Sequence, residues 1–105
     1  NGLFLLAWHE GGLGGGVGLR PIEAGVCEMK RLFVYDAFKR KGVGRTLCTK
    51  LIQEAMHLGY TKMRLDTLGR MKAAMILYKK LGFKEIEPYR FNPDPTTKHM
   101  ELHLR

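Results

Sequence analysis

Residues 38–47 read FKRKGVGRTL and follow a predicted strand, at the point where the pattern of a helix begins. Glycines in a loop before a helix let the backbone approach a ligand closely, because no Cβ intervenes. The first-turn amides of a helix lack intrahelical partners and lie at the positive end of its dipole, so they suit phosphate. Four residues add full charges here: Lys39, Arg40, Lys41 and Arg45. The stretch therefore predicts an anion site, with a simple turn into a solvated helix as the alternative.

The two glycines of this stretch, Gly42 and Gly44, fit neither of two common nucleotide-binding patterns. A P-loop requires the pattern G-x-x-x-x-G-K-[ST], which this stretch does not contain. Leu47 stands where the dinucleotide fingerprint G-x-G-x-x-G has its third glycine. The predicted anion site therefore belongs to neither class.

Outward from the glycine loop, hydrophobic patterns predict six strands and two helices. Apolar residues recur at every fourth position from Val43 to Ala55, which predicts an amphipathic helix that ends at Gly59. A second helix is predicted over 72–81. The predicted strands are 2–9, 17–22, 26–35, 62–67, 83–87 and 99–104, and the glycine run 11–16 is expected to be a hairpin turn. This order predicts a sheet with helices packed on it, an α/β or α+β fold.

The strand predicted over 26–35 carries charge on a face that should be partly enclosed. Its alternation places on one face Cys27, Met29 and Phe33. The opposite face carries Glu28, Lys30 and Leu32.

The composition of the 105 residues fits one compact domain with an anionic partner. The net charge of +8 and a pI near 9.8 would attract nucleic acid, a phosphate-bearing cofactor or an acidic membrane face. No apolar run approaches the length of a membrane span, and segment 3–8 is too short for a signal peptide. Cys27 and Cys48 are expected to be small buried thiols in a reducing compartment, so we expect a cytoplasmic location.

Two motifs follow one another with a strand between them: K-R-K-G-V-G-R at 39–45 and L-Y-K-K-L-G-F at 77–83. Together they resemble the GNAT superfamily of N-acetyltransferases, and the resemblance extends from residue 2 to the C-terminus. The family signature Q/R-x-x-G-x-G/A has Lys39 at its first position here, which keeps the charge but loses the planar fork. The second signature is met by Ala74, Leu77, Tyr78, Gly82 and Phe83. Met71 replaces an asparagine that is frequent in the family, which removes one expected cofactor contact.

The resemblance implies an acetyl-CoA-dependent N-acetyltransferase with an α+β GNAT fold. The expected sheet is mixed and mostly antiparallel, with about six strands flanked by two helices. The strands at 26–35 and 62–67 would splay apart in a V, and the pantetheine arm of coenzyme A would enter the gap. The chain would form a single acetyltransferase domain over 1–105, without the usual first strand and first two helices of the family.

In the family, the pyrophosphate of coenzyme A rests on the glycine loop and the start of the following helix. The implied cofactor site comprises Leu32, Phe33, Val34, Lys39, Arg40, Lys41, Gly42, Val43, Gly44, Arg45, Thr46, Ala74, Tyr78 and Lys80. Acetyl-CoA would be the acetyl donor, and no metal is expected. His99 and His103 alternate along a predicted strand, which leaves them roughly 13 Å apart and unsuited to one metal ion.

Acetyl transfer from a thioester to an amine places three demands on the site. The acceptor ammonium, with a pKa of roughly 10.4, must lose a proton. The developing oxyanion needs a donor, for which the family uses a backbone N–H of the splayed strand, and the departing thiolate benefits from an acid. Tyr78 is the candidate acid, and its alternative role is that of a core aromatic.

Glu28 is the candidate base. Its position relative to Gly42 matches that of the general-base glutamate in the histone-modifying branch of the family. Desolvation on an enclosed strand would raise its pKa toward neutrality, as a base requires. The alternative is a salt bridge to Lys30 or Arg64.

The acceptor is expected to be a small-molecule or peptide amine. Because Asp and Glu total only ten, a small amine or a neutral or acidic partner is favoured over a polybasic peptide. Tyr89, Arg90 and Asn92 lie in a proline-flanked loop and are candidate substrate contacts. Two other functions stay open: a non-catalytic acyl-CoA-binding relic, and a basic nucleic-acid-binding domain, although no helix-turn-helix, zinc-finger or RNA-recognition motif is present. The sequence leaves open whether the chain forms a homodimer.

Overall fold

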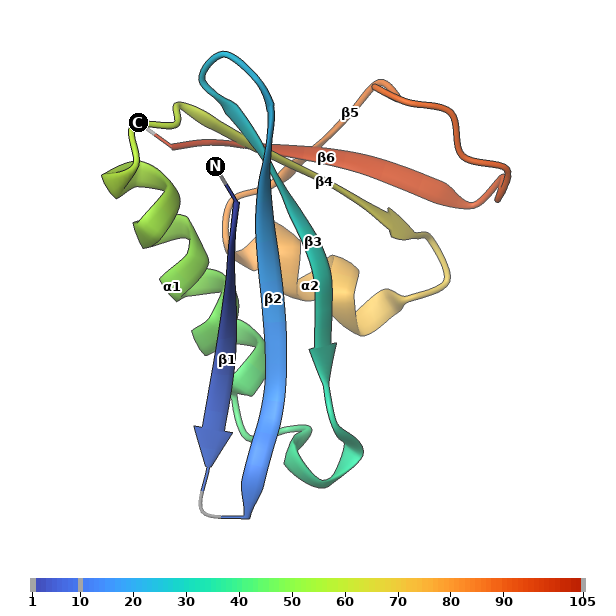
Figure 1. The fold of residues 1–105 in the computed structure, drawn as a ribbon. Coiled ribbons are helices and arrows are strands. Elements are labelled where there is room, and N and C mark those ends of the chain that lie inside the picture. The colour runs from blue at the N-terminus through green and yellow to red at the C-terminus, as the bar shows by residue number, and fades with distance from the viewer. Residues whose placement is uncertain (1, 10, 105) are drawn as a thin grey trace.

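The computed structural model describes residues 2–9 and 11–104 and shows a six-stranded sheet with two helices on one of its faces (Figure 1). The strands are β1 (Leu3–His9), β2 (Gly12–Glu23), β3 (Val26–Val34), β4 (Lys62–Leu68), β5 (Lys84–Ile86) and β6 (Thr97–His103). The helices are α1 (Val43–His57), α2 (Lys72–Lys80) and the short 3-10 helix η1 (Asp36–Phe38). The predicted α+β architecture is confirmed.

The strands follow one another in the sheet in the order β1-β2-β3-β4-β6-β5. β3 and β4 run parallel because α1 crosses over between them, and the other neighbours within the described sheet are antiparallel. Figure 1 shows β3 and β4 adjacent at one end and diverging toward the other. The mixed, mostly antiparallel sheet that the resemblance implied is therefore confirmed.

The core lies between the sheet and the two helices. The buried residues of α1 are Val43, Leu47, Cys48, Leu51 and Ala55, which confirms the predicted apolar face. Tyr78 of α2 joins the same cluster as Met63 and Leu65 of β4 and Met100 of β6. The opposite face of the sheet, here called the helix-free face, carries Glu28 of β3, Arg64 and Asp66 of β4, and Glu101 of β6. Within the described residues, neither helix has the length and apolarity that a membrane crossing requires.

The prediction that the glycine run 11–16 forms a hairpin turn is wrong, because Gly12 to Gly16 lie within β2. These glycines allow close packing of the strands. A Cβ on Gly15 would clash with the carbonyl oxygen of Phe33, and one on Gly16 would lie 2.8 Å from the Phe33 ring. Glycine in a strand marks a close approach of another group, and the sequence alone does not distinguish this use from a turn.

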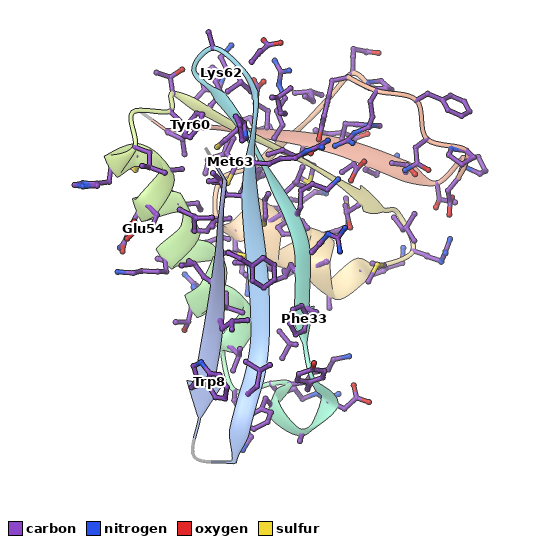
Figure 2. The ribbon with its side chains drawn as sticks, viewed as in Figure 1. Trp8, Phe33, Glu54, Tyr60, Lys62 and Met63 are labelled. Carbon is purple, nitrogen blue, oxygen red and sulfur yellow. The ribbon has the colours of Figure 1, made fainter. Side chains whose placement is uncertain are left out.

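β3 contains a β-bulge that the sequence did not predict. After Lys30 the register shifts, and two residues of β3 lie opposite one residue of β2. Arg31 in this bulge has a φ of 58°. A bulge moves the side chains that follow it to the other face. Phe33, which is labelled in Figure 2, therefore stacks on Phe4 of β1, with ring centroids 6.4 Å apart. Leu32 packs against the core, so both residues lie on the reverse of their predicted faces.

Candidate active site

β3 and β4 part after the pair Glu28↔Arg64, the last of three residue pairs that join them. Beyond this pair β3 stays with β2, and β4 stays with β6. A groove of about 1000 Å³ lies along the gap. The predicted V-shaped splay is confirmed, and the bulge in β3 supplies a physical reason, since a bulge bends the strand that carries it. Arg64 was one of the two predicted alternative ion-pair partners of Glu28. Its Nε donates instead to Glu101 Oε2 at 2.9 Å.

The groove extends from the splay to the glycine loop and along α2. The predicted cofactor residues that line it are Leu32, Phe33, Val34, Lys39, Arg40, Gly42, Val43, Gly44, Arg45, Ala74 and Tyr78. Lys41, Thr46 and Lys80 lie outside this lining and are exposed. The fold thus brings the splayed strand, the glycine loop and the second motif to one groove.

The start of α1 leaves backbone donors that the helix itself does not use. Its first internal hydrogen bond joins the Thr46 N–H to the Gly42 carbonyl at 3.0 Å, so the amides of Val43, Gly44 and Arg45 precede it. Among the residues that the structure describes, no side chain caps this helix, and Gly42 at the N-cap has a left-handed φ of 78°. Free amides at the positive end of a helix dipole are suited to an anion.

Tyr78 lies on the buried face of α2 and contributes to the groove. It is 6% exposed and packs edge-on against Phe83, with centroids 5.8 Å apart. Burial raises the pKa of the Tyr78 phenol above its ordinary value, and the charges of Cys48 and Asp66 add to the shift. The phenol is therefore protonated near neutral pH. This residue is therefore a core aromatic that also lines the groove.

Glu28 is fully buried on the helix-free face and is engaged by several groups at once. Its Oε1 accepts a hydrogen bond from Arg20 Nε at 2.8 Å and lies 3.6 Å from Lys30 Nζ. Its Oε2 accepts a hydrogen bond from the Tyr89 hydroxyl at 2.6 Å and contacts Arg90. Adjacent cations favour the ionised form of a carboxylate. The Lys30 ion pair that the sequence offered as an alternative is present.

The loop between β5 and β6 supplies two of these partners of Glu28. Arg90 also lies 3.6 Å from Asp66 Oδ2 on β4, and the Tyr89 ring packs edge-on against His99 at 4.9 Å. Asn92 from the same loop lines the groove. Tyr89, Arg90 and Asn92, the predicted substrate contacts, therefore come from one loop at the splay.

Comparison with known proteins decides the family. Residues 1–83 match the family model described as "Acetyltransferase (GNAT) family". The chain belongs to the GNAT family. An uncharacterized N-acetyltransferase of Schizosaccharomyces pombe is 41% identical over 106 residues, which cover 99% of this chain and 65% of the relative. An uncharacterized N-acetyltransferase of Escherichia coli is 30% identical over 82 residues, which cover 75% of this chain and 49% of the relative. The chain thus spans less than two thirds of the length of either relative.

Solved structures of the GNAT family share this fold. An acetyltransferase of the GNAT family from Staphylococcus aureus has a TM-score of 0.86 at 21% identity, and the match covers 99% of this chain and 68% of that one. The PaiA N-acetyltransferase from Thermoplasma acidophilum, solved in complex with coenzyme A, has a TM-score of 0.84 at 25% identity. This match covers 98% of this chain and 61% of the PaiA chain. The GNAT resemblance carried by the two sequence motifs is confirmed.

Sequence reasoning assigned no place in the site to five polar residues of the groove, which are Lys30, Arg31, Asp66, Thr67 and Thr97. Asp66 follows Arg64 at the spacing of a strand, so a carboxylate on a splaying strand was a readable signal. Thr97 belongs to β6, which begins two residues before the predicted strand. Met71 also lines the groove, at the position where the resemblance implied a lost cofactor contact.

Proposed function

We propose that this chain transfers the acetyl group of acetyl-CoA to a primary amine by direct attack in a ternary complex. The observation that carries the proposal is the groove between β3 and β4, which leads to an uncapped helix N-terminus among cations. Such a groove suits an extended thioester arm at one end and a diphosphate at the other. GNAT membership and the N-acetyltransferase names of the relatives support the reaction class.

The donor would rest its diphosphate on the first-turn amides of α1. Lys39, Arg40 and Arg45 line this end of the groove. Lys39 pairs with Asp36 at 3.1 Å, but both side chains are largely exposed, so the pair is weak and a phosphate can replace it. The pantetheine arm would lie between the splayed strands.

Gly44 provides a test of fit for this ligand. A Cβ at this position would meet Leu77 and Val34 at 3.6 Å each, which is an ordinary contact within the protein. The packing of the chain therefore does not require glycine here, although glycine in a helix costs roughly 1 kcal/mol relative to alanine. A ligand that rests against the backbone supplies a reason for it.

The reaction forms a C–N bond and breaks a C–S bond. The acceptor ammonium releases its proton, and the neutral amine then attacks the thioester carbonyl carbon. A backbone N–H of the bulged segment around Arg31 would donate to the carbonyl oxygen as negative charge develops. The electron pair of the C–S bond moves to sulfur, where the Tyr78 phenol, protonated because it is buried, would donate.

Glu28 stays a prediction as the base. Its side chain is 1% exposed, so a proton would reach it through the Tyr89 hydroxyl or a water molecule. The same contacts suit a second role, in which the carboxylate anchors the loop that carries Tyr89 and Arg90. The variant Glu28→Gln distinguishes the two roles. Loss of a base lowers kcat most at low pH, whereas loss of an anchor lowers stability and leaves the shape of the pH profile unchanged.

Calorimetry with acetyl-CoA, followed by thiol release in the presence of a panel of amines, tests the proposed function. We expect binding in the micromolar range and thiol release that depends on the amine. Binding without release would indicate an acyl-CoA-binding protein that does not catalyse transfer. If acetyl-CoA does not bind but nucleic acid does, the proposal is wrong.

A further inference from the structure

The groove carries one negative charge among its described lining residues, the carboxylate of Asp66 on β4. The cations of the lining are Lys30, Arg31, Lys39, Arg40 and Arg45. An ammonium group that enters this groove therefore meets attraction at Asp66 and repulsion elsewhere. An acceptor amine arrives in this ammonium form, because its pKa is roughly 10.4.

Asp66 lies beyond the point at which the two strands part. It follows Arg64, the last residue of β4 that pairs with β3, by two positions, and it stands opposite His99 of β6 on the helix-free face. Its charge contributes to the raised pKa of Tyr78, which lies on the helix side of the sheet. Asp66 and Tyr78 therefore both line the groove, from opposite faces of the sheet.

Buried polar atoms beside Asp66 make no hydrogen bond within the described part of the chain. Arg90 Nε is one such atom, and the others belong to two residues of β6, Thr97 (Oγ1) and His99 (both ring nitrogens). The two residues share a face of β6, and His99 is only 3% exposed. A buried polar atom without a partner is unfavourable. Of the two residues, Thr97 belongs to the groove lining and His99 does not, so a polar group of a bound ligand would satisfy Thr97 Oγ1.

Asp66 already pairs with a cation of this chain, the guanidinium of Arg90. Arg90 Nε lies 3.6 Å from its Oδ2, while Nη2 of the same guanidinium contacts Glu28. The Asp66 side chain is 25% exposed, so solvent reaches it. An ionised carboxylate has about four acceptor sites, and this ion pair leaves Asp66 free to accept hydrogen bonds from an ammonium group.

We infer that Asp66 docks the ammonium group of the acceptor, and that the acceptor is a primary amine with one positive charge. The inference rests on the acetyl transfer proposed above. Asp66 holds the acceptor nitrogen at the splay, on the side of the sheet opposite Tyr78. A second ammonium group on the acceptor would meet Lys30, Arg31 or Arg90, and like charges in contact oppose binding.

Variants of Asp66 test the inference, with butylamine and 1,4-diaminobutane as probes. Asp66→Asn should raise the KM for butylamine roughly tenfold while the KM for acetyl-CoA stays the same. Asp66→Glu should recover part of this loss, because it keeps the charge. The wild-type chain should have the higher kcat/KM with butylamine. The control Glu54→Gln removes the same charge from α1 (Figure 2), outside the groove lining, and should change neither KM.

The outcomes separate this inference from the proposed function. Acetyl-CoA calorimetry and thermal unfolding on each variant establish that the donor still binds and that the chain is folded. An unchanged butylamine KM in Asp66→Asn, or an equal rise in the KM for acetyl-CoA, contradicts docking at Asp66. Preference for the diamine, or donor binding with neither amine accepted, contradicts the acceptor class. A wild-type chain that binds no acetyl-CoA refutes the acetyl transfer itself.

Discussion

Arg90 contacts Glu28 of β3 and lies 3.6 Å from Asp66 of β4, so one guanidinium joins the two strands that part at the groove. These strands are hydrogen-bonded to each other only before the splay. At the point where the strands part, Arg90 of the β5–β6 loop links β3 to β4 through ion pairs with Glu28 and Asp66. The geometry of the open end therefore depends on a side chain that follows both strands in the sequence.

Replacement of Arg90 by alanine is expected to lower the free energy of unfolding by about 1–2 kcal/mol. The buried carboxylate of Glu28 would keep two other cations, so the loss is smaller than for an isolated buried pair. Urea denaturation measures the change. The control Arg70→Ala removes an arginine whose pair with Asp94 is largely exposed, and it should cost less than about 1 kcal/mol. Equal losses in the two variants would contradict an anchoring role for Arg90.

The variant Gly44→Ala is expected to separate ligand binding from stability. The new Cβ would meet Leu77 and Val34 at an ordinary distance of 3.6 Å, and alanine favours a helix by roughly 1 kcal/mol. The free energy of unfolding should stay the same or rise, while the dissociation constant for acetyl-CoA should increase roughly tenfold. Calorimetry and thermal unfolding measure the two effects.

Gly42→Ala is the matched comparison for Gly44→Ala. Gly42 has a φ of 78° with open space around its Cβ position, so alanine there meets backbone strain instead of crowding. We expect a loss of stability of about 1–2 kcal/mol. If Gly44→Ala leaves the acetyl-CoA affinity unchanged, the backbone at the start of α1 does not hold the donor.

The sequence predicts the fold well where neighbouring residues alone control the structure. The four-residue period of α1 and the glycine loop before it are local patterns, and both are found in the structure. The bulge at Arg31 and the strand at 12–16 depend on the pairing of β2 with β3. Local pattern reasoning assigned the wrong faces to Leu32 and Phe33 because it has no information about that pairing.

The candidate site likewise contains residues that local motifs predict and residues whose surroundings depend on distant parts of the chain. The glycine loop and Tyr78 belong to motifs with fixed spacing, so sequence reasoning placed both near the donor. The contacts of Glu28 were only partly predictable, because Tyr89 lies 61 positions away in the sequence and reaches it through the β5–β6 loop. Asp66 lies on a strand that was expected to splay, but which of its side chains line the groove depends on the pairing of β4 with β3 and β6.

Tyr78→Phe is expected to lower kcat roughly a hundredfold while the affinity for acetyl-CoA changes little. Phenylalanine keeps the ring and its edge-on contact with Phe83, so only the hydroxyl is lost. Steady-state kinetics and calorimetry measure the two quantities. The control Tyr35→Phe removes the hydroxyl of a tyrosine that is 51% exposed and outside the groove lining. An unaltered kcat would remove Tyr78 from the mechanism.

Both cysteines are expected to be unreactive in the folded chain, in agreement with direct attack and not with an acetyl-cysteine intermediate. Burial raises the pKa of Cys27 to about 11 and that of Cys48 to about 12. The thiolate is the nucleophile, so at about pH 8 almost none of either residue can react, and labelling should speed up about tenfold for each unit by which the pH rises. Iodoacetamide should therefore label neither residue quickly until denaturant returns both thiols to a pKa of roughly 8.5. Rapid labelling of Cys48 without denaturant, blocked by acetyl-CoA, would instead support a covalent route.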